Sequence, residues 1–178
     1  MNHISLKNSK KFKLISGDKN KIHIDKNYTK QFFLKETIVH GVNLALLGLI
    51  KFSKSFKKNR IKNLKIDFKN YCFTDEKFII RLKSKSIIIK NKLNNKVIIE
   101  LKNSSLKLNN LNPHNVLSKK IIKFYKLKKS KDYLNFDLIN HLIKISRYIG
   151  NTSPGPGSLI HSITSKETGN VNNSSDFA

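Results

Sequence analysis

Charged and apolar residues alternate along the middle of this chain. Apolar side chains occupy every second position of residues 64–68 and 78–82, and lysine, arginine or aspartate fills most of the positions between them. A period of two is typical of β-strands with one buried and one exposed face. Further short strands are expected at residues 86–90, 96–101 and 105–108. The pattern therefore predicts an antiparallel sheet with one face on a core and a lysine-rich opposite face.

Three helices are expected around this sheet. Apolar residues recur at three- and four-residue steps in residues 37–52. A second helix begins at Asn112, a good N-cap, with Pro113 at its first position. A third runs from Asn135 to Ile149. The sequence thus predicts an α+β fold, in which two helices pack on an antiparallel sheet and an extra C-terminal helix and an extended tail follow.

The early part of the chain predicts little regular structure. Residues 12–15 and 21–25 alternate weakly, and residues 16–20 (Ser-Gly-Asp-Lys-Asn) have the composition of a turn, so a small hairpin is expected there. The tail contains Ser-Pro-Gly-Pro-Gly-Ser at residues 153–158, which fits neither a helix nor a central strand.

Positive charge is spread through the apolar segments. The formal net charge is +25 over 178 residues, yet residues 151–178 contain one lysine and two acidic residues. Nearly all of the excess therefore lies in the first 150 residues, where the folded surface would repel itself without an anionic partner. RNA or DNA is the expected partner.

Lysines gather around the second helix. Seven of them lie between residues 119 and 131 without an acidic residue, which favours phosphate contacts over the alternative of a solvated helix face. Phe124 lies on the apolar stripe of that helix, whereas Tyr125 lies one step off it and is the candidate to stack on a base. The expected RNA contacts are Tyr125 and the lysines Lys83, Lys85, Lys119, Lys120, Lys123, Lys126, Lys128, Lys129 and Lys131.

No catalytic or metal-binding pattern is recognised. The six histidines lack metal-ligand spacing, and the single cysteine, Cys72, rules out a disulfide within the chain. His40-Gly41 is interpreted as the start of a helix and Cys72 as a buried small side chain. The carboxylates Asp67, Asp75, Glu76 and Glu100 are too dispersed to indicate a nuclease. We therefore expect no enzyme activity, no cofactor and no small-molecule substrate, and no apolar run is long enough to span a membrane.

Residues 36–131 resemble the second domain of the large-subunit ribosomal protein six (L-six) family. Residues 38–47 (Ile-Val-His-Gly-Val-Asn-Leu-Ala-Leu-Leu) resemble its His-Gly helix opening, and residues 64–71 and 79–86 resemble its next two strands. Residues 106–129 stand where the family delivers a basic loop to RNA. The resemblance implies a structural, non-catalytic protein that braces ribosomal RNA near the factor-binding region, beside neighbouring ribosomal proteins.

Four segments follow from this interpretation. They are a basic N-terminal extension or remnant of a first domain (1–35), an α+β RNA-binding core (36–131), a C-terminal helix (132–150) and a tail rich in Pro, Gly, Ser and Asn (151–178).

Composition adds an expected location. Lysine outnumbers arginine 33 to 3, which is typical of an A/T-rich genome, so we expect a mitochondrial and organelle-encoded ribosomal protein. The alternatives are a lineage-specific ribosomal protein of another family, small subunit included, or a basic accessory subunit of an organellar membrane complex.

Overall fold

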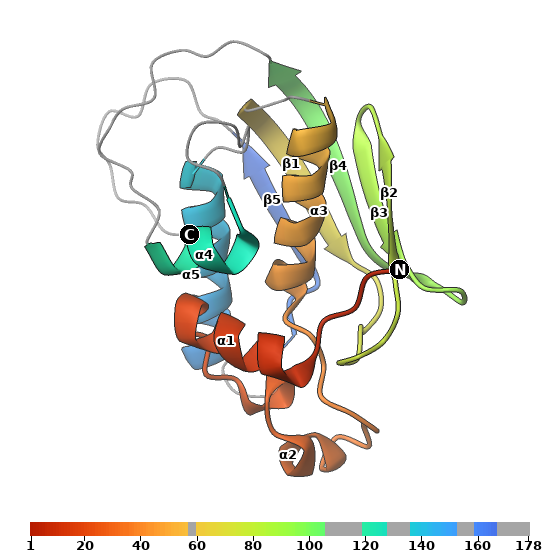
Figure 1. The fold of residues 1–178 in the computed structure, drawn as a ribbon, viewed down its shortest axis with the longest axis vertical. Coiled ribbons are helices and arrows are strands. Elements are labelled where there is room, and N and C mark those ends of the chain that lie inside the picture. The colour runs from red at the N-terminus through yellow and green to blue at the C-terminus, as the bar shows by residue number, and fades with distance from the viewer. Residues whose placement is uncertain (57–59, 106–118, 128–135, 153–158, 167–178) are drawn as a thin grey trace.

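The fold is α+β, as the sequence predicts. A computed structural model describes residues 1–56, 60–105, 119–127, 136–152 and 159–166 (Figure 1). Five strands form one sheet in the order β2-β3-β4-β1-β5, and every neighbouring pair is antiparallel. The strands are β1 (Arg60–Phe68), β2 (Ile79–Lys83), β3 (Ser86–Lys90), β4 (Asn95–Ser105) and β5 (Ser162–Lys166).

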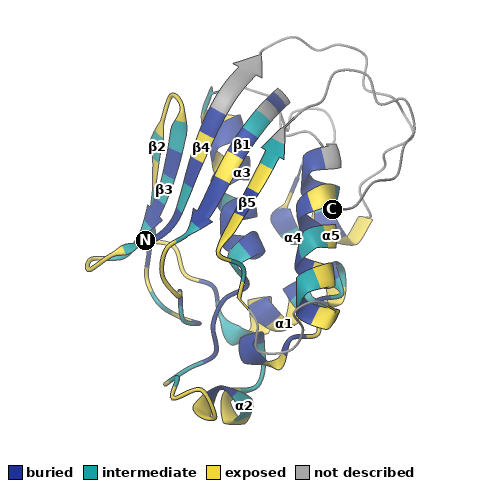
Figure 2. Ribbon diagram, turned by 180° about the vertical axis from the view of Figure 1, so that it is seen from behind, coloured by how far each residue is buried: buried dark blue, intermediate teal, exposed yellow. Residues whose placement is uncertain are grey.

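Helices cover one face of this sheet. Figure 1 shows α3 lying along the sheet, with α1, α4 and α5 on the same side. Seen from behind, the other face of the sheet carries no helix in the described part of the chain (Figure 2). The helical elements are α1 (Leu6–Ser16), the 3-10 helix η1 (Lys21–His23), α2 (Lys26–Lys30), α3 (Gly41–Phe56), α4 (Lys119–Tyr125) and α5 (Phe136–Asn151). None of these helices has the length and apolar character that a membrane span requires.

The core lies between α3 and the sheet. Leu46 and Leu49 on α3 are fully buried, as are the inward side chains Ile87, Ile89 and Ile99 of the sheet. A Cβ on Gly48 would lie 3.1 Å from Ile87 Cγ2 and 3.3 Å from Ile89 Cδ1. Glycine at this position therefore lets the helix approach the strands closely.

The period-two pattern placed the strands well. The expected strands at residues 64–68, 86–90 and 96–101 fall within β1, β3 and β4, and most of residues 78–82 fall within β2. The expected strand at 105–108 is represented by the end of β4 at Ser105, and its other residues lie outside the described ones. The third expected helix is confirmed as α5, whereas Asn112 and Pro113 also lie outside the described residues.

The predicted N-terminal hairpin is wrong. Residues 6–16 form α1, which begins after the N-cap Ser5 and ends at Gly17 with φ 74°. The buried positions of α1 are Ser9, Phe12 and Ser16, a helical spacing of three and four residues. Two of the three are serines, so the stripe carries almost no hydrophobic signal.

Part of the expected tail belongs to the sheet. Residues 162–166 form β5, which pairs with β1 and sets Ile163 opposite Ile66. Ile163 is buried there, so β5 extends the core as well as the sheet. The four segment boundaries drawn from the sequence stay a prediction.

Helix α3 offers a direct test of this core. Replacing the fully buried Leu49 with alanine should lower the free energy of unfolding by about 2–5 kcal/mol, through lost apolar burial and the cavity left behind. Leu14→Ala is the matched control, because Leu14 is also helical but 76 % exposed. Urea denaturation measures both variants, and equal effects would contradict the placement of α3.

Candidate functional site

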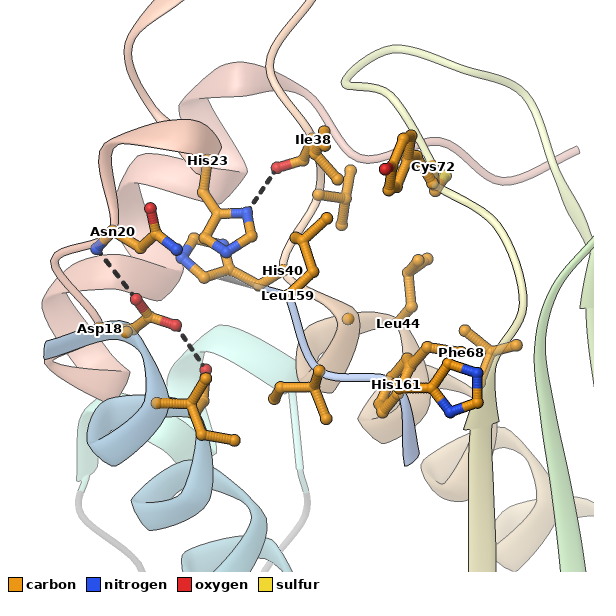
Figure 3. A pocket seen from close by; sticks show the side chains of 18 of the residues that line it. Asp18, Asn20, His23, Ile38, His40, Leu44, Phe68, Cys72, Leu159 and His161 are labelled. Atoms are coloured by element: carbon orange, nitrogen blue, oxygen red, sulfur yellow. Dashed lines mark hydrogen bonds between the residues drawn. The ribbon is translucent and has the colours of Figure 1, made fainter. Parts of the chain in front are cut away.

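A pocket lies where the N-terminal end of α3 meets the loop after α1. It has a volume of about 280 Å³ and is lined from α3, the end of β1, the C-terminal part of α5 and the segment before β5. Figure 3 shows Asp18, His23 and His40 together on one side of it. These three residues are all buried, and one ligand-type atom from each lies within 4.8 Å of the others.

Asp18 is fixed in this pocket by two hydrogen bonds. Its Oδ1 accepts from the backbone N–H of Asn20 at 3.0 Å, and its Oδ2 accepts from the Ser146 hydroxyl at 2.7 Å. A Cβ on Gly150 would lie 1.9 Å from Asp18 Oδ1, so only glycine at that position leaves room for the carboxylate. Asp18 is therefore a buried acidic group held in one orientation.

His23 has the tautomer of a general base. Its Nδ1 lies 2.8 Å from the backbone carbonyl of Ile38, and because a carbonyl only accepts, Nδ1 carries the proton. Nε2 is then the unprotonated nitrogen. Burial lowers the pKa of His23 below 6.5, and the nearby Asp18 carboxylate partly opposes this by favouring the imidazolium. The ring is thus neutral near pH 7, with a proton acceptor beside Asp18.

His40 stacks on His23. The two ring centroids are 3.9 Å apart with 30° between the planes, and the ring of Phe12 lies 4.9 Å away from His40. Neither nitrogen of His40 has a hydrogen-bond partner among the described residues. Burial, and secondarily the neighbouring His23, lowers the pKa of His40 well below 6.5. The neutral His40 ring therefore packs against the face of the His23 ring and holds it in its plane.

The same three residues fit a metal ion poorly. A zinc ion requires lone pairs that converge on one point about 2.0–2.1 Å from each nitrogen. The two imidazole rings instead lie in nearly parallel planes with centroids 3.9 Å apart, so lone pairs in these planes do not converge on a single ion. We therefore interpret the cluster as an acid–base site.

Helix α3 adds a polar feature to the pocket wall. Its first residue, Gly41, lines the pocket, and the first turn of a helix leaves N–H groups without helical partners. These groups and the helix dipole favour negative charge at this point. A Cβ on Gly41 would lie 2.8 Å from the ring of Phe68, so glycine is needed for this close approach.

The rest of the pocket is largely apolar. Leu44, Phe68, Val97, Leu159 and Ile160 contribute to its walls. Cys72 also lines it, and burial raises the pKa of its thiol to about 12. The thiol therefore stays protonated, which agrees with its interpretation as a buried small side chain.

The residues predicted to bind RNA do not meet at this site. Lys119, Lys120, Lys123 and Lys126 are exposed on and just after α4. Lys83 and Lys85 are exposed at the β2–β3 turn, at the opposite edge of the sheet from β5 (Figure 1). Lys128, Lys129 and Lys131 lie outside the described residues.

Tyr125 is not available to stack on a base. It is buried, its hydroxyl donates to Asn43 Oδ1 at 2.8 Å, and burial raises its pKa well above 10. The neighbouring Phe124 is only partly buried. The sequence predicted Phe124 on the buried stripe of the helix and Tyr125 beside it. In the structure, the short helix α4 instead presents Ile121 and Tyr125, four residues apart, to the interior.

A comparison with protein families decides the assignment. The family model described as "MaoC like domain" matches residues 2–104, more than half of the chain. The chain belongs to the MaoC-like domain family. The match contains Asp18, His23, His40 and the whole of α3, and α4, α5 and β5 lie beyond it. No curated protein and no solved structure matches the chain.

This match overturns the ribosomal interpretation. Assignment to the L-six family is wrong, and so are the structural role in the large subunit, the ribosomal RNA and protein partners, and the expectation of no enzyme activity and no small-molecule substrate. Interleaved lysines indicate an anionic partner but do not identify it. The mitochondrial location stays a prediction from composition.

The sequence did contain a signal for the site. Asp18 lies in a segment interpreted only as a turn, with His23 five residues later, and His40-Gly41 was interpreted only as a helix start. Both local interpretations hold in part, since residues 17–20 lie between helices and Gly41 begins α3. His23 and His40 stack only because residues 24–39 fold back between them, and the spacing of the two histidines in the sequence does not predict this.

The buried histidines predict a loss of stability in acid. Because folding lowers both pKa values, the unfolded chain binds protons below about pH 6.5 that the folded chain does not, so the free energy of unfolding falls as pH falls. His40→Leu removes one of these groups. Urea denaturation at about pH 7.5 and about pH 5.5 should therefore show a smaller loss in His40→Leu than in the wild type.

His141→Leu is the control, since His141 is exposed on α5. This variant should keep the pH dependence of the wild type. Equal pH dependence in wild type and His40→Leu would contradict the burial of a neutral His40.

Proposed function

We propose that this MaoC-like domain catalyses the reversible addition of water to the α,β double bond of an acyl thioester. The observation that carries the proposal is the neutral His23, with Nε2 unprotonated, beside the buried carboxylate of Asp18 at a helix N-terminus. The family's dehydratase name and a fold consistent with a hotdog arrangement, in which a long helix lies on an antiparallel sheet, support it.

His23 is the group that moves the proton. In hydration, Nε2 takes a proton from water while the water oxygen bonds to the β carbon, and the double-bond electrons shift toward the α carbon and the thioester oxygen. The imidazolium then returns its proton to the α carbon, which completes the addition. Dehydration is the same sequence reversed, with His23 taking the α proton and giving it to the departing hydroxyl.

Asp18 supports this proton transfer electrostatically. Its carboxylate lies close enough to raise the pKa of His23 against the effect of burial, so it stabilises the imidazolium that forms during the reaction. Its oxygens accept from Asn20 and Ser146, which fixes their direction. Lone pairs that remain on these oxygens can orient the reacting water.

The start of α3 has the position of an anion-stabilising group. Negative charge develops on the thioester oxygen when water adds to the β carbon. Backbone N–H groups of the first turn, beginning at Gly41, stabilise such charge without having to reorganise. The lack of a side chain at Gly41 lets the ring of Phe68 pack directly against the start of the helix, beside these N–H groups.

The surroundings suit an acyl group on a phosphorylated carrier. Leu44, Phe68 and Val97 provide an apolar wall for the acyl chain. Lys69 lines the pocket and is exposed, on a chain with a net charge of +25. Coenzyme A, with several phosphates, is a carrier of matching charge.

The proposal predicts that both Asp18 and His23 are required. Asp18→Asn and His23→Gln should each lower kcat for hydration of crotonyl-coenzyme A by about a hundredfold to ten-thousandfold, the usual contribution of a positioned acid–base group. Loss of the absorbance of the conjugated thioester measures the rate. Asp75→Asn and His141→Gln are the controls, because both residues are exposed and neither lines the pocket.

Two results would contradict this assignment. One is full activity in either pocket variant while its thermal unfolding midpoint matches the wild type. The other is a wild-type protein that neither hydrates unsaturated acyl thioesters nor dehydrates 3-hydroxyacyl thioesters.

The lowered pKa of His23 also predicts the pH dependence of the rate. A general base works in its neutral form, and a pKa below 6.5 keeps that form populated to lower pH than in an ordinary imidazole. The pH at which kcat/KM is half lost on the acid side should therefore lie below 6.5. A pH–rate profile in a constant-ionic-strength buffer measures it, and an acid limb above that value would exclude His23 as the base.

A further inference from the structure

Helix α5 lies beyond the family match but holds the loop that carries Asp18. Its Ser146 hydroxyl donates to Asp18 Oδ2 at 2.7 Å, and the Nε of Arg147 donates to the carbonyl of Ser16 at 2.7 Å. Asn151 makes two further bonds: its Nδ2 donates to the carbonyl of Gly17 at 2.8 Å, and its Oδ1 accepts from the N–H of Lys19 at 2.8 Å. Three side chains of residues 146–151 thus hold four consecutive residues, 16–19.

The contact between the two segments is tight. A Cβ on Gly150 would overlap Asp18 Oδ1, and a Cβ on Gly17 would lie 2.7 Å from Arg147 Nε. Two glycines, one on each segment, therefore allow this approach. Ser146 is itself buried, so its hydroxyl is shielded from solvent where it meets the carboxylate.

We propose that Ser146 is a positioning residue for Asp18, and that residues 146–151 of α5 form a clamp that holds the 16–19 loop in its reactive geometry. The inference rests on the proposed function, because it concerns the same acid–base pair. Without the Ser146 hydroxyl, Oδ2 of a buried carboxylate loses a donor, and the group is free to turn toward another partner.

The mechanism separates this role from a simple contribution to stability. A misdirected Asp18 carboxylate stabilises the His23 imidazolium and orients water less well, and both effects act on the transition state. In the proposed function the acyl group and its carrier bind elsewhere in the pocket, on the apolar wall and at Lys69. Loss of Ser146 should therefore change kcat and leave KM nearly unchanged.

Ser146→Ala tests the proposal, with Ser9→Ala as a matched control. Both serines are buried on helices, but Ser9 Oγ has no hydrogen-bond partner among the described residues, and Ser9 does not line the pocket. With crotonyl-coenzyme A, we expect kcat of Ser146→Ala to fall about tenfold and KM to stay within about twofold. Ser9→Ala should keep the wild-type kcat, and Ser146→Thr, which retains a hydroxyl, should recover most of the lost rate.

A second variant tests the clamp even if Ser146→Ala does not fold. Asn151 is exposed, so Asn151→Ala removes two bonds to the loop without opening a cavity in the core. Its kcat should also fall, by about threefold or more, with KM unchanged. Wild-type kcat in both Ser146→Ala and Asn151→Ala would overturn the proposal, as would a rise in KM with kcat constant.

The same assay distinguishes failure of the clamp proposal from failure of the proposed function. If the wild type is active and Asp18→Asn is not, while Ser146→Ala behaves as Ser9→Ala does, the clamp is refuted and the proposed function stands. If the wild type and Asp18→Asn are both inactive, the proposed function itself fails, and the inference about Ser146 fails with it.

Discussion

The close packing of α3 on the sheet is the constraint on which the site depends. Gly48 brings the helix near Ile87 and Ile89, and the fully buried Leu46 and Leu49 hold it there. This contact fixes where the N-terminal end of α3 lies, and with it His40 and Gly41. The positions of the stacked histidines and of the pocket therefore depend on an apolar interface that takes no part in the chemistry.

Segments far apart in the sequence complete the site. The loop after α1 brings Asp18, η1 brings His23, and α5 supplies the hydroxyl that holds the carboxylate. β5 pairs with β1, and the segment before it passes the pocket, where Leu159 lines the wall (Figure 3) together with Ile160. The residues beyond the family match thus take part in the same pocket as the residues within it.

The sequence predicted what local patterns determine. Strands β1, β3 and β4 were placed by alternation, because one buried face imposes a period of two, and α5 by its apolar stripe. α1 was missed because serines fill two of its three buried positions. The site was missed because Asp18, His23 and Ser146 meet only in the folded chain. The predicted partner, ribosomal RNA, was wrong because a positive net charge indicates that a partner is anionic but not which kind of molecule it is.

The most direct test follows the proton that His23 is proposed to carry. Crotonyl-coenzyme A is incubated with the wild type or His23→Gln in deuterated water, and the product is examined by mass spectrometry. The account predicts that the wild type forms a 3-hydroxyacyl thioester with one deuterium on its α carbon, and that His23→Gln, folded as the wild type, forms almost none. Equal product formation by both proteins, or no product with the wild type, would contradict the central claim.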